Sequence, residues 1–193
     1  KTAERGIQMI MGKGATGGGG KRYYLVMNGS DYLEAELDDD TTKTTWAKLP
    51  NNSRNMYIPR MNWSGNSDAV LIQHVNRQQN INKLYLSQSN SGQSQLIMTE
   101  QDDAFLDRFR DPKWLAKGKS FIWLSEKNGW RHIYRINRNG QNSINLTPGD
   151  FDVIQVSKVD EKTGWLYFIL HQIMLHKNIY IVVNSMLASP IKE

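Results

Sequence analysis

The stretch KSFIWLSEKNGWRHIYRINRNG, residues 119–140, holds an apolar run, a polar Glu-Lys-Asn-Gly turn and a second run with a central tyrosine. Two runs of strand length joined by an Asn-Gly turn predict a β-hairpin. The second run also places Arg131 beside His132, two residue types that serve in catalysis. The segment therefore allows two interpretations, a piece of architecture or a site, and the rest of the chain decides between them.

The same order of elements occurs 51 positions earlier, where Trp63 takes the place of Trp114. Each block continues with a polar turn, an apolar run, a second turn, a run with a central tyrosine (Tyr85 or Tyr134), a third turn and a last run. We predict strands over residues 69–75, 83–87 and 95–99 in the first block and over 120–125, 131–136 and 143–147 in the second.

A third copy occupies residues 156–169, with a strand expected over 165–168, and a weaker copy at residues 32–50 has Asp38-Asp39-Asp40 at its turn. Repeats of about 40–50 residues with four strands each are typical of β-propeller blades. A β-sandwich would show turn signals without this block-wise repetition. The predicted fold is all-β, a partial β-propeller of about three to four four-stranded blades in an open arc.

The repeat favours architecture over a site at Arg131 and His132. The corresponding positions in the first block hold Asn82 and Lys83, so the positions themselves do not require catalytic side chains. Blades bury both faces against their neighbours, and Trp130, Ile133 and Tyr134 suit that packing.

Composition excludes several functions for this 193-residue chain. It has no cysteine, which excludes disulfides and thiolate metal sites. The net charge of +5 comes from scattered lysines and arginines rather than a basic patch, so no nucleic-acid partner is expected. No apolar run reaches the roughly 20 residues of a membrane helix, and we expect no membrane segment in this chain.

Catalytic and metal-binding motifs are missing as well. No Gly-x-Ser-x-Gly string occurs, and the glycine run at 12–22 fails as a phosphate loop because Lys21 is followed by Arg22. We interpret that run as a linker. The four histidines, His74, His132, His171 and His176, lack zinc-type spacing. We therefore predict no catalytic residue, no metal site and no cofactor.

Two short boxes make the repeat specific. They are Asn-Arg-x-Gln-Asn at residues 76–80 and Gly-Trp-Arg-His-Ile-Tyr at residues 129–134. With the segments 57–86, 119–140 and 146–169 around them, they resemble the propeller of the dipeptidyl-peptidase IV family, in the prolyl oligopeptidase superfamily of serine peptidases. The resemblance extends over residues 42–169.

The resemblance implies a parent enzyme that is a serine-type peptidase and releases N-terminal X-Pro or X-Ala dipeptides. In such enzymes a propeller caps a hydrolase domain that carries Ser, Asp and His, and a pair of glutamates holds the amine of the peptide. Neither the hydrolase domain nor the glutamate pair is in this sequence. The expectation is a non-catalytic propeller fragment that meets peptide substrates through that domain. The resemblance also implies a homodimeric parent in the periplasm or outside the cell.

Two other interpretations remain open at this point. The chain could be a stand-alone propeller that serves as a scaffold for protein or glycan binding. It could also be a gene fragment without a function of its own.

One pair of site residues follows from the resemblance. The string DRFRDP at 107–112 resembles a loop whose Phe and Arg approach the substrate in some family members, and the matching residues are Phe109 and Arg110. An arginine fork suits a substrate carbonyl or carboxylate, and a phenylalanine suits an apolar wall. The alternative is a loop that only anchors itself on the blade.

The resemblance divides the chain into an atypical glycine-rich segment at 1–27, propeller blades at 28–169 and an atypical segment at 170–193. Residues 170–180 can be encoded so that a shift of one base reads Ala-Ser-Pro-Asp-Asn-Ala-Thr-Gln-Lys-Tyr-Ile, which resembles the family's continuation. We therefore expect residues 170 to about 187 to be a frame-shifted translation.

Overall fold

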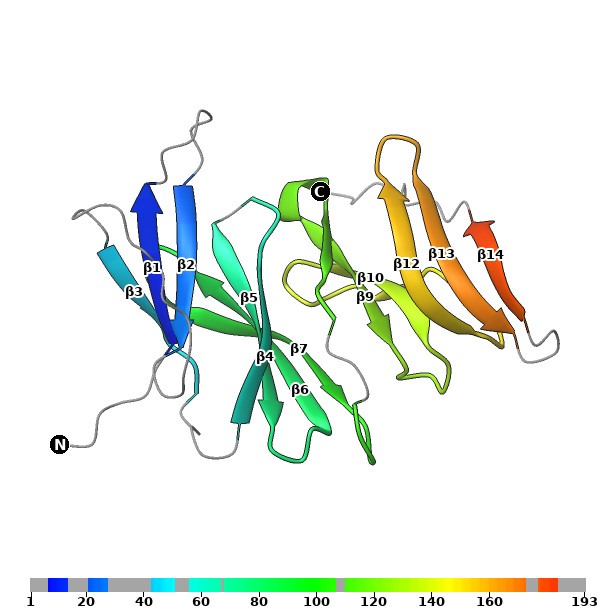
Figure 1. Ribbon diagram of the computed structural model, residues 1–193, viewed down its shortest axis with the longest axis horizontal. Coiled ribbons are helices and arrows are strands. Elements are labelled where there is room, and N and C mark those ends of the chain that lie inside the picture. The colour runs from blue at the N-terminus through cyan, green and yellow to red at the C-terminus, as the bar shows by residue number, and fades with distance from the viewer. Residues whose placement is uncertain are drawn as a thin grey trace. The chain divides into compact units, whose positions relative to one another are not determined.

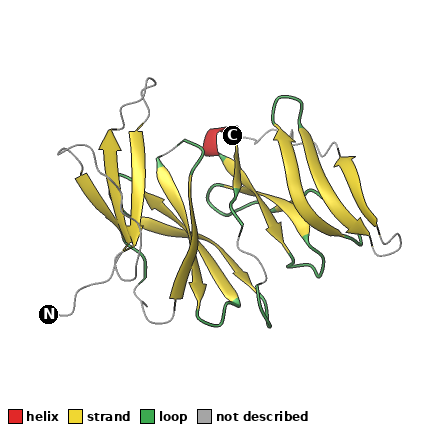
Figure 2. Cartoon of the chain, viewed as in Figure 1, coloured by secondary structure: helices red, strands yellow, loops and turns green. Residues whose placement is uncertain are grey.

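The computed structural model describes residues 7–13, 21–27, 43–50, 56–66, 68–106, 110–172 and 177–183. Almost every described element is a strand, and one 3₁₀ turn, η1 (Ala116–Gly118), is the helical element among them (Figure 2). The chain divides into two compact units, Lys1–Thr99 and Glu100–Glu193. The all-β class predicted from the sequence is confirmed.

The first unit holds two sheets (Figure 1). One has the order β2-β1-β3 and the other the order β4-β5-β6-β7. Their strands are β1 (Ile7–Lys13), β2 (Lys21–Met27), β3 (Lys43–Ala47), β4 (Met56–Trp63), β5 (Ala69–Asn76), β6 (Ile81–Gln88) and β7 (Ser94–Gln101). In the second sheet sequential strands are neighbours, which is the meander of a propeller blade.

The second unit also has two sheets, with the orders β11-β10-β9-β8 and β12-β13-β14. Their strands are β8 (Lys113–Leu115), β9 (Ser120–Ser125), β10 (His132–Asn137), β11 (Ile144–Asn145), β12 (Asp152–Asp160), β13 (Trp165–Gln172) and β14 (Lys177–Val183). The strand expected at 165–168 lies within β13.

The strand register reproduces the repeat seen in the sequence. Trp63 on β4 lies opposite Val70 on β5, and Trp114 on β8 lies opposite Phe121 on β9. Both pairs are therefore offset by the same 51 positions. The similarity between the two sequence blocks is therefore also a structural repeat, because equivalent residues have equivalent partners across the sheet.

The Asn-Arg-x-Gln-Asn box forms the turn between β5 and β6. The Asn76 side-chain oxygen accepts the backbone N–H groups of Asn80 and Ile81 at 3.1 and 3.0 Å, and the Asn76 amide donates to the Asn80 side chain at 2.7 Å. Gln79 has a φ of 59°. Asparagine suits such turns because its side chain satisfies nearby backbone groups. The box is thus a structural device that closes a hairpin.

Each unit has its own apolar cluster. In the second unit the cluster joins β9 and β10 to β12 and β13, and its members include Ile133, which is fully buried, and Phe168. In the first unit a smaller cluster contains Ile72 and Tyr85. The first three residues of β10, His132 to Tyr134, are all buried, so both faces of the strand are covered at this end. Burial alternates only beyond them, with Ile136 buried and Arg135 half-buried.

Strand β11 is shorter than the predicted range 143–147. It pairs with β10 at Ile144 and Asn145, and the Leu146 N–H also donates to the Ile133 carbonyl at 2.8 Å. The Ile133 N–H does not return this bond to a backbone carbonyl, because it donates to the Thr147 hydroxyl at 2.9 Å. The side chain therefore replaces one backbone acceptor, and the strand ends there.

The N-terminal segment 1–27, which the sequence sets apart as glycine-rich and atypical, contains two strands. Strands β1 and β2 lie inside the segment 1–27, where no strand was predicted, and β3 pairs with β1. The glycine run between β1 and β2 and the turn at Asp38–Asp40 lie outside the described residues, apart from the ends of the run.

Candidate functional site

A pocket of about 60 Å³ lies in the second unit, where the last residues of β7 and the linker to β8 meet the β9–β10 turn. It is lined by Glu100, Gln101, Asp102, Phe105, Leu106, Arg110, Leu124, Ser125, Glu126, Lys127 and Arg131. Three carboxylates and three cationic side chains share the lining, so the site is polar and close to electrically balanced.

The linker turns sharply as it leaves β7. The Asp102 carboxylate accepts the backbone N–H groups of Ala104 and Phe105 at 2.8 and 3.2 Å, an arrangement typical of aspartate in turns. The turn places Phe105 at the pocket with 52% of its surface exposed. Phe105 and Leu106 form an apolar part of the wall.

The Glu100 carboxylate accepts hydrogen bonds from two side chains of β9. The Trp123 indole Nε1–H donates to its Oε2 at 3.1 Å. The Ser125 hydroxyl also hydrogen-bonds the carboxylate and accepts the Lys127 backbone N–H at 3.3 Å. A carboxylate can only accept, so the serine hydroxyl donates to it. The result is a directed chain from Lys127 through Ser125 to Glu100.

Burial raises the pKa of the Glu100 carboxyl above the ordinary glutamate value. The hydrogen bonds from Ser125 and Trp123 act in the opposite direction because they stabilise the charged form. The nearby charge of Glu126 raises the pKa further, and that of Lys127 lowers it. Desolvation is the largest of these effects.

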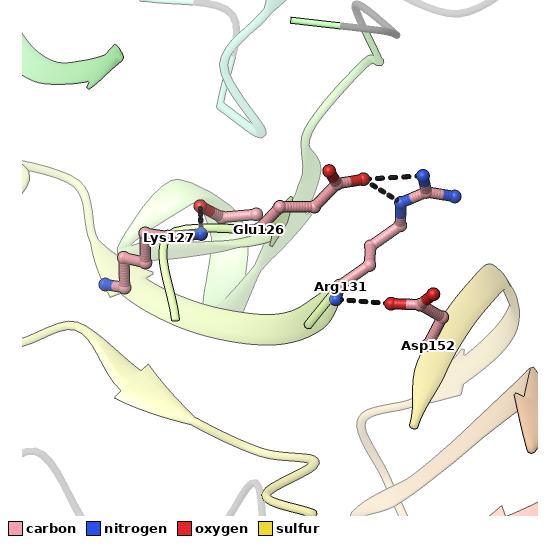
Figure 3. A network of polar contacts seen from close by, with 5 residues as sticks. Glu126, Lys127, Arg131 and Asp152 are labelled. Atoms are coloured by element: carbon pink, nitrogen blue, oxygen red, sulfur yellow. Dashed lines mark hydrogen bonds and ion pairs between the residues drawn. The ribbon is translucent and has the colours of Figure 1, made fainter. Parts of the chain in front are cut away.

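The β9–β10 turn brings Glu126 and Arg131 together (Figure 3). Arg131 Nε donates to Glu126 Oε1 at 2.6 Å, and a second guanidinium nitrogen lies 2.5 Å from the same oxygen. The Arg131 backbone N–H donates to the Asp152 carboxylate at 2.8 Å. Gly129, with φ of 87°, closes the turn by donating to the Glu126 carbonyl. Arg131 therefore connects this turn to the start of β12, through its side chain on Glu126 and its backbone N–H on Asp152.

Lys127 extends along the other side of the same hairpin. Its ammonium lies 4.0 Å from the centre of the Tyr134 ring and donates to the Ser143 hydroxyl at 2.9 Å. Burial raises the pKa of the Tyr134 hydroxyl, and the negative charge of Glu100 adds to that rise. Cation–π contact and a hydrogen bond together fix the direction of the lysine.

Of the two substrate-proximal residues expected from the sequence, Arg110 lines this pocket. Phe109 lies outside the described residues. His132 packs edge-on against the Phe151 ring, with the ring centres 5.7 Å apart, and burial lowers its pKa against the opposing effect of Asp152 and Asp150. It is a buried core histidine and does not line the pocket.

Sequence reasoning missed Glu100, Ser125 and Lys127. The one available signal was Trp123, because a tryptophan in a buried strand usually needs an acceptor for its N–H. The sequence does not show which acceptor that is. Glu100 is 23 positions away and sits at the end of another strand.

Comparison with known proteins identifies the family. The model of the dipeptidyl peptidase IV (DPP IV) N-terminal region matches residues 35–186, most of the chain. The chain belongs to this family. The resemblance seen in the two boxes and the repeated blocks is thereby confirmed.

Relatives of this family member carry the same family name. Dipeptidyl peptidase 4 of Arthroderma otae and that of Trichophyton rubrum are each 30% identical to it over 119 residues, which is 58% of this chain. The chain spans 15% of the length of these relatives.

A solved structure supports the fold. The crystal structure of Porphyromonas gingivalis dipeptidyl peptidase 4 superimposes with a TM-score of 0.60 at 22% identity, over 90% of this chain and 27% of that one. The fold is an all-β partial propeller with open sheets. In the part of the chain that the structure describes, no helix is long and apolar enough to cross a membrane.

Proposed function

We propose that this chain is a non-catalytic propeller part of a serine-type dipeptidyl peptidase, which as a whole releases N-terminal X-Pro or X-Ala dipeptides. The family membership and the names of the relatives support this proposal. Under this proposal a hydrolase domain of the whole enzyme cleaves the peptide, and the propeller forms a wall around the substrate. The whole enzyme acts as a homodimer in the periplasm or outside the cell.

The observation that carries the proposal for this chain is the pocket at Arg110. The residue expected to approach the substrate lies beside an exposed aromatic ring, Phe105, and a directed ammonium, Lys127. Extended peptides present carbonyl oxygens, which accept from guanidinium and ammonium groups. An apolar wall beside these donors suits a peptide side chain.

Two carboxylates of the pocket have partners within the chain. Glu126 is occupied by Arg131, and Asp102 is occupied by two backbone N–H groups. Arg131 offsets the charge of Glu126, and the two N–H groups stabilise the charge of Asp102. Lys127 has three N–H donors, of which one points to Ser143.

A peptide titration followed by NMR tests this role. Ala-Pro-Gly-Gly with a free amine, added to the ¹⁵N-labelled chain, is expected to shift the Arg110 Nε–H and Lys127 signals with a dissociation constant of about 1 mM, or about 4 kcal/mol of binding. Arg110→Lys, which loses the planar fork, should weaken binding. Arg138→Lys is the matched control, because Arg138 stacks on Trp114 and donates to the Gly118 carbonyl. Shifts that avoid the pocket, or equal losses in both variants, would refute the proposed role.

The non-catalytic part of the proposal has its own test. The chain should not hydrolyse an Ala-Pro chromogenic amide and should not be labelled by a serine-directed phosphonate. Hydrolysis or labelling by the purified chain would show that it carries a nucleophile.

A further inference from the structure

One residue of the pocket, Glu100, has no role in the proposed function. Glu100 is half-buried at the end of β7, and its carboxylate turns toward β9 to meet Trp123 and Ser125. Trp123 itself is almost fully buried. Removing a carboxylate from water is unfavourable unless donors replace the lost hydration. Two donors on one strand supply that replacement here.

The linker begins two residues beyond Glu100, after the end of β7. Glu100 is followed by Gln101 and then by Asp102, whose carboxylate folds the chain back by accepting the N–H groups of Ala104 and Phe105. Because the turn is local, it fixes the shape of the linker but not its position against β9. A hydrogen bond to β9 is made just before the linker, at Glu100, whose carboxylate accepts the Trp123 indole N–H.

We propose that Glu100 is a positioning residue, whose carboxylate, held by Trp123 and Ser125, fixes the start of the linker and thereby the Phe105–Leu106 wall of the pocket. Its importance for peptides rests on the proposed function. The anchoring itself does not, because it concerns contacts within this chain. The neighbouring Glu126 serves as a contrast, since it lines the same pocket but pairs with Arg131 inside its own turn.

Loss of Glu100 should therefore loosen the linker locally without destabilising the core of the unit. If Glu100 fixes the linker, its loss frees the indole N–H of Trp123 and the amides of Ala104 and Phe105. The Ile133 amide, which donates to the buried Thr147 hydroxyl in the core, should keep its protection. Regions open with their own free energies, so the two sets of amides are separable.

Hydrogen exchange measured by NMR on the full chain tests this. In Glu100→Ala we expect exchange of the Trp123 indole and of the Ala104 and Phe105 amides to rise about tenfold, or about 1.4 kcal/mol, with Ile133 unchanged. Glu126→Ala should leave the linker amides unchanged. If Glu100→Ala does not fold, Trp123→Phe removes the same bond from the other side and keeps a ring in the core.

Three results would overturn the proposal. They are a faster indole with unchanged linker amides, an equal rise at Ile133, and an equal effect of Glu126→Ala on the linker. No peptide is present in this experiment. A failed peptide titration would therefore refute the proposed function without affecting the role of Glu100. Unchanged linker amides in Glu100→Ala would refute the role of Glu100 without affecting the proposed function.

Discussion

Gly149 offers a sharp test of how the second unit is packed. It has a φ of 148°, and a Cβ added there would lie 2.5 Å from Cε1 and 2.9 Å from Cδ1 of Phe151. The ring cannot simply turn away, because it packs on the apolar cluster and lies edge-on to the buried His132. Gly149→Ala therefore meets both an unfavourable backbone conformation and a steric clash.

The magnitude follows from these two effects. A non-glycine residue in such a sparsely populated region costs about 1–3 kcal/mol. Forcing extra volume against a packed ring costs about 1–3 kcal/mol more. We expect a total loss of roughly 4 kcal/mol in the free energy of unfolding, a large part of the 5–15 kcal/mol of a typical domain.

Gly129 provides the matched control. Its φ is 87°, and nothing lies within 4 Å of an added Cβ, so Gly129→Ala should cost only the backbone strain of about 1–2 kcal/mol. Urea unfolding followed by tryptophan fluorescence measures both variants. Equal losses at Gly149 and Gly129 would refute the role of the Phe151 ring. Phe151→Leu in the Gly149→Ala background should recover part of the loss, as expected for residues in contact.

Three further outcomes are expected. The pKa of Glu100 is raised in the folded state, so the folded state binds the carboxyl proton more tightly than the unfolded state. Stability should therefore fall as pH rises from the ordinary glutamate pKa through the folded pKa. Urea unfolding midpoints measured across this pH range should show the fall in the original chain and not in Glu100→Gln. Thr147→Val should cost about 1–3 kcal/mol, because the buried Ile133 N–H loses its acceptor, whereas Ile144→Ala, at a side chain 44% exposed, should change unfolding by no more than about 0.5 kcal/mol. Sequencing of the coding DNA should reveal a one-base change of frame near position 170; an uninterrupted frame through residue 187 would exclude the shift.

The sequence was sufficient for the blade pattern because strand and turn signals repeat. Trp63 and Trp114 mark equivalent strands, and the residues opposite them are equivalent too. A single block would have been ambiguous, since short apolar runs do not distinguish one β-architecture from another. Two blocks with the same order of elements remove most of that ambiguity.

The site was less predictable, since its chemistry depends on contacts between strands rather than on spacing along the chain. Trp123 could have donated to a backbone carbonyl, a water or a side chain. Only the structure shows that Glu100 accepts. In the same way, the strand expected to reach residue 147 stops at Asn145, because the Thr147 hydroxyl supplies an acceptor that no periodicity reveals.

Arg131 and His132 show why adjacent polar residues must be distinguished by their environment before a function is assigned. Arg131 immediately precedes β10 and His132 is its first residue, and the two side chains meet different surroundings. Arg131 pairs with Glu126 at the pocket, while His132 is buried against Phe151. Burial is also the main reason that the pKa of His132 is lowered. The same hairpin thus contributes Arg131 to the lining of the pocket and His132 to the packing around Phe151.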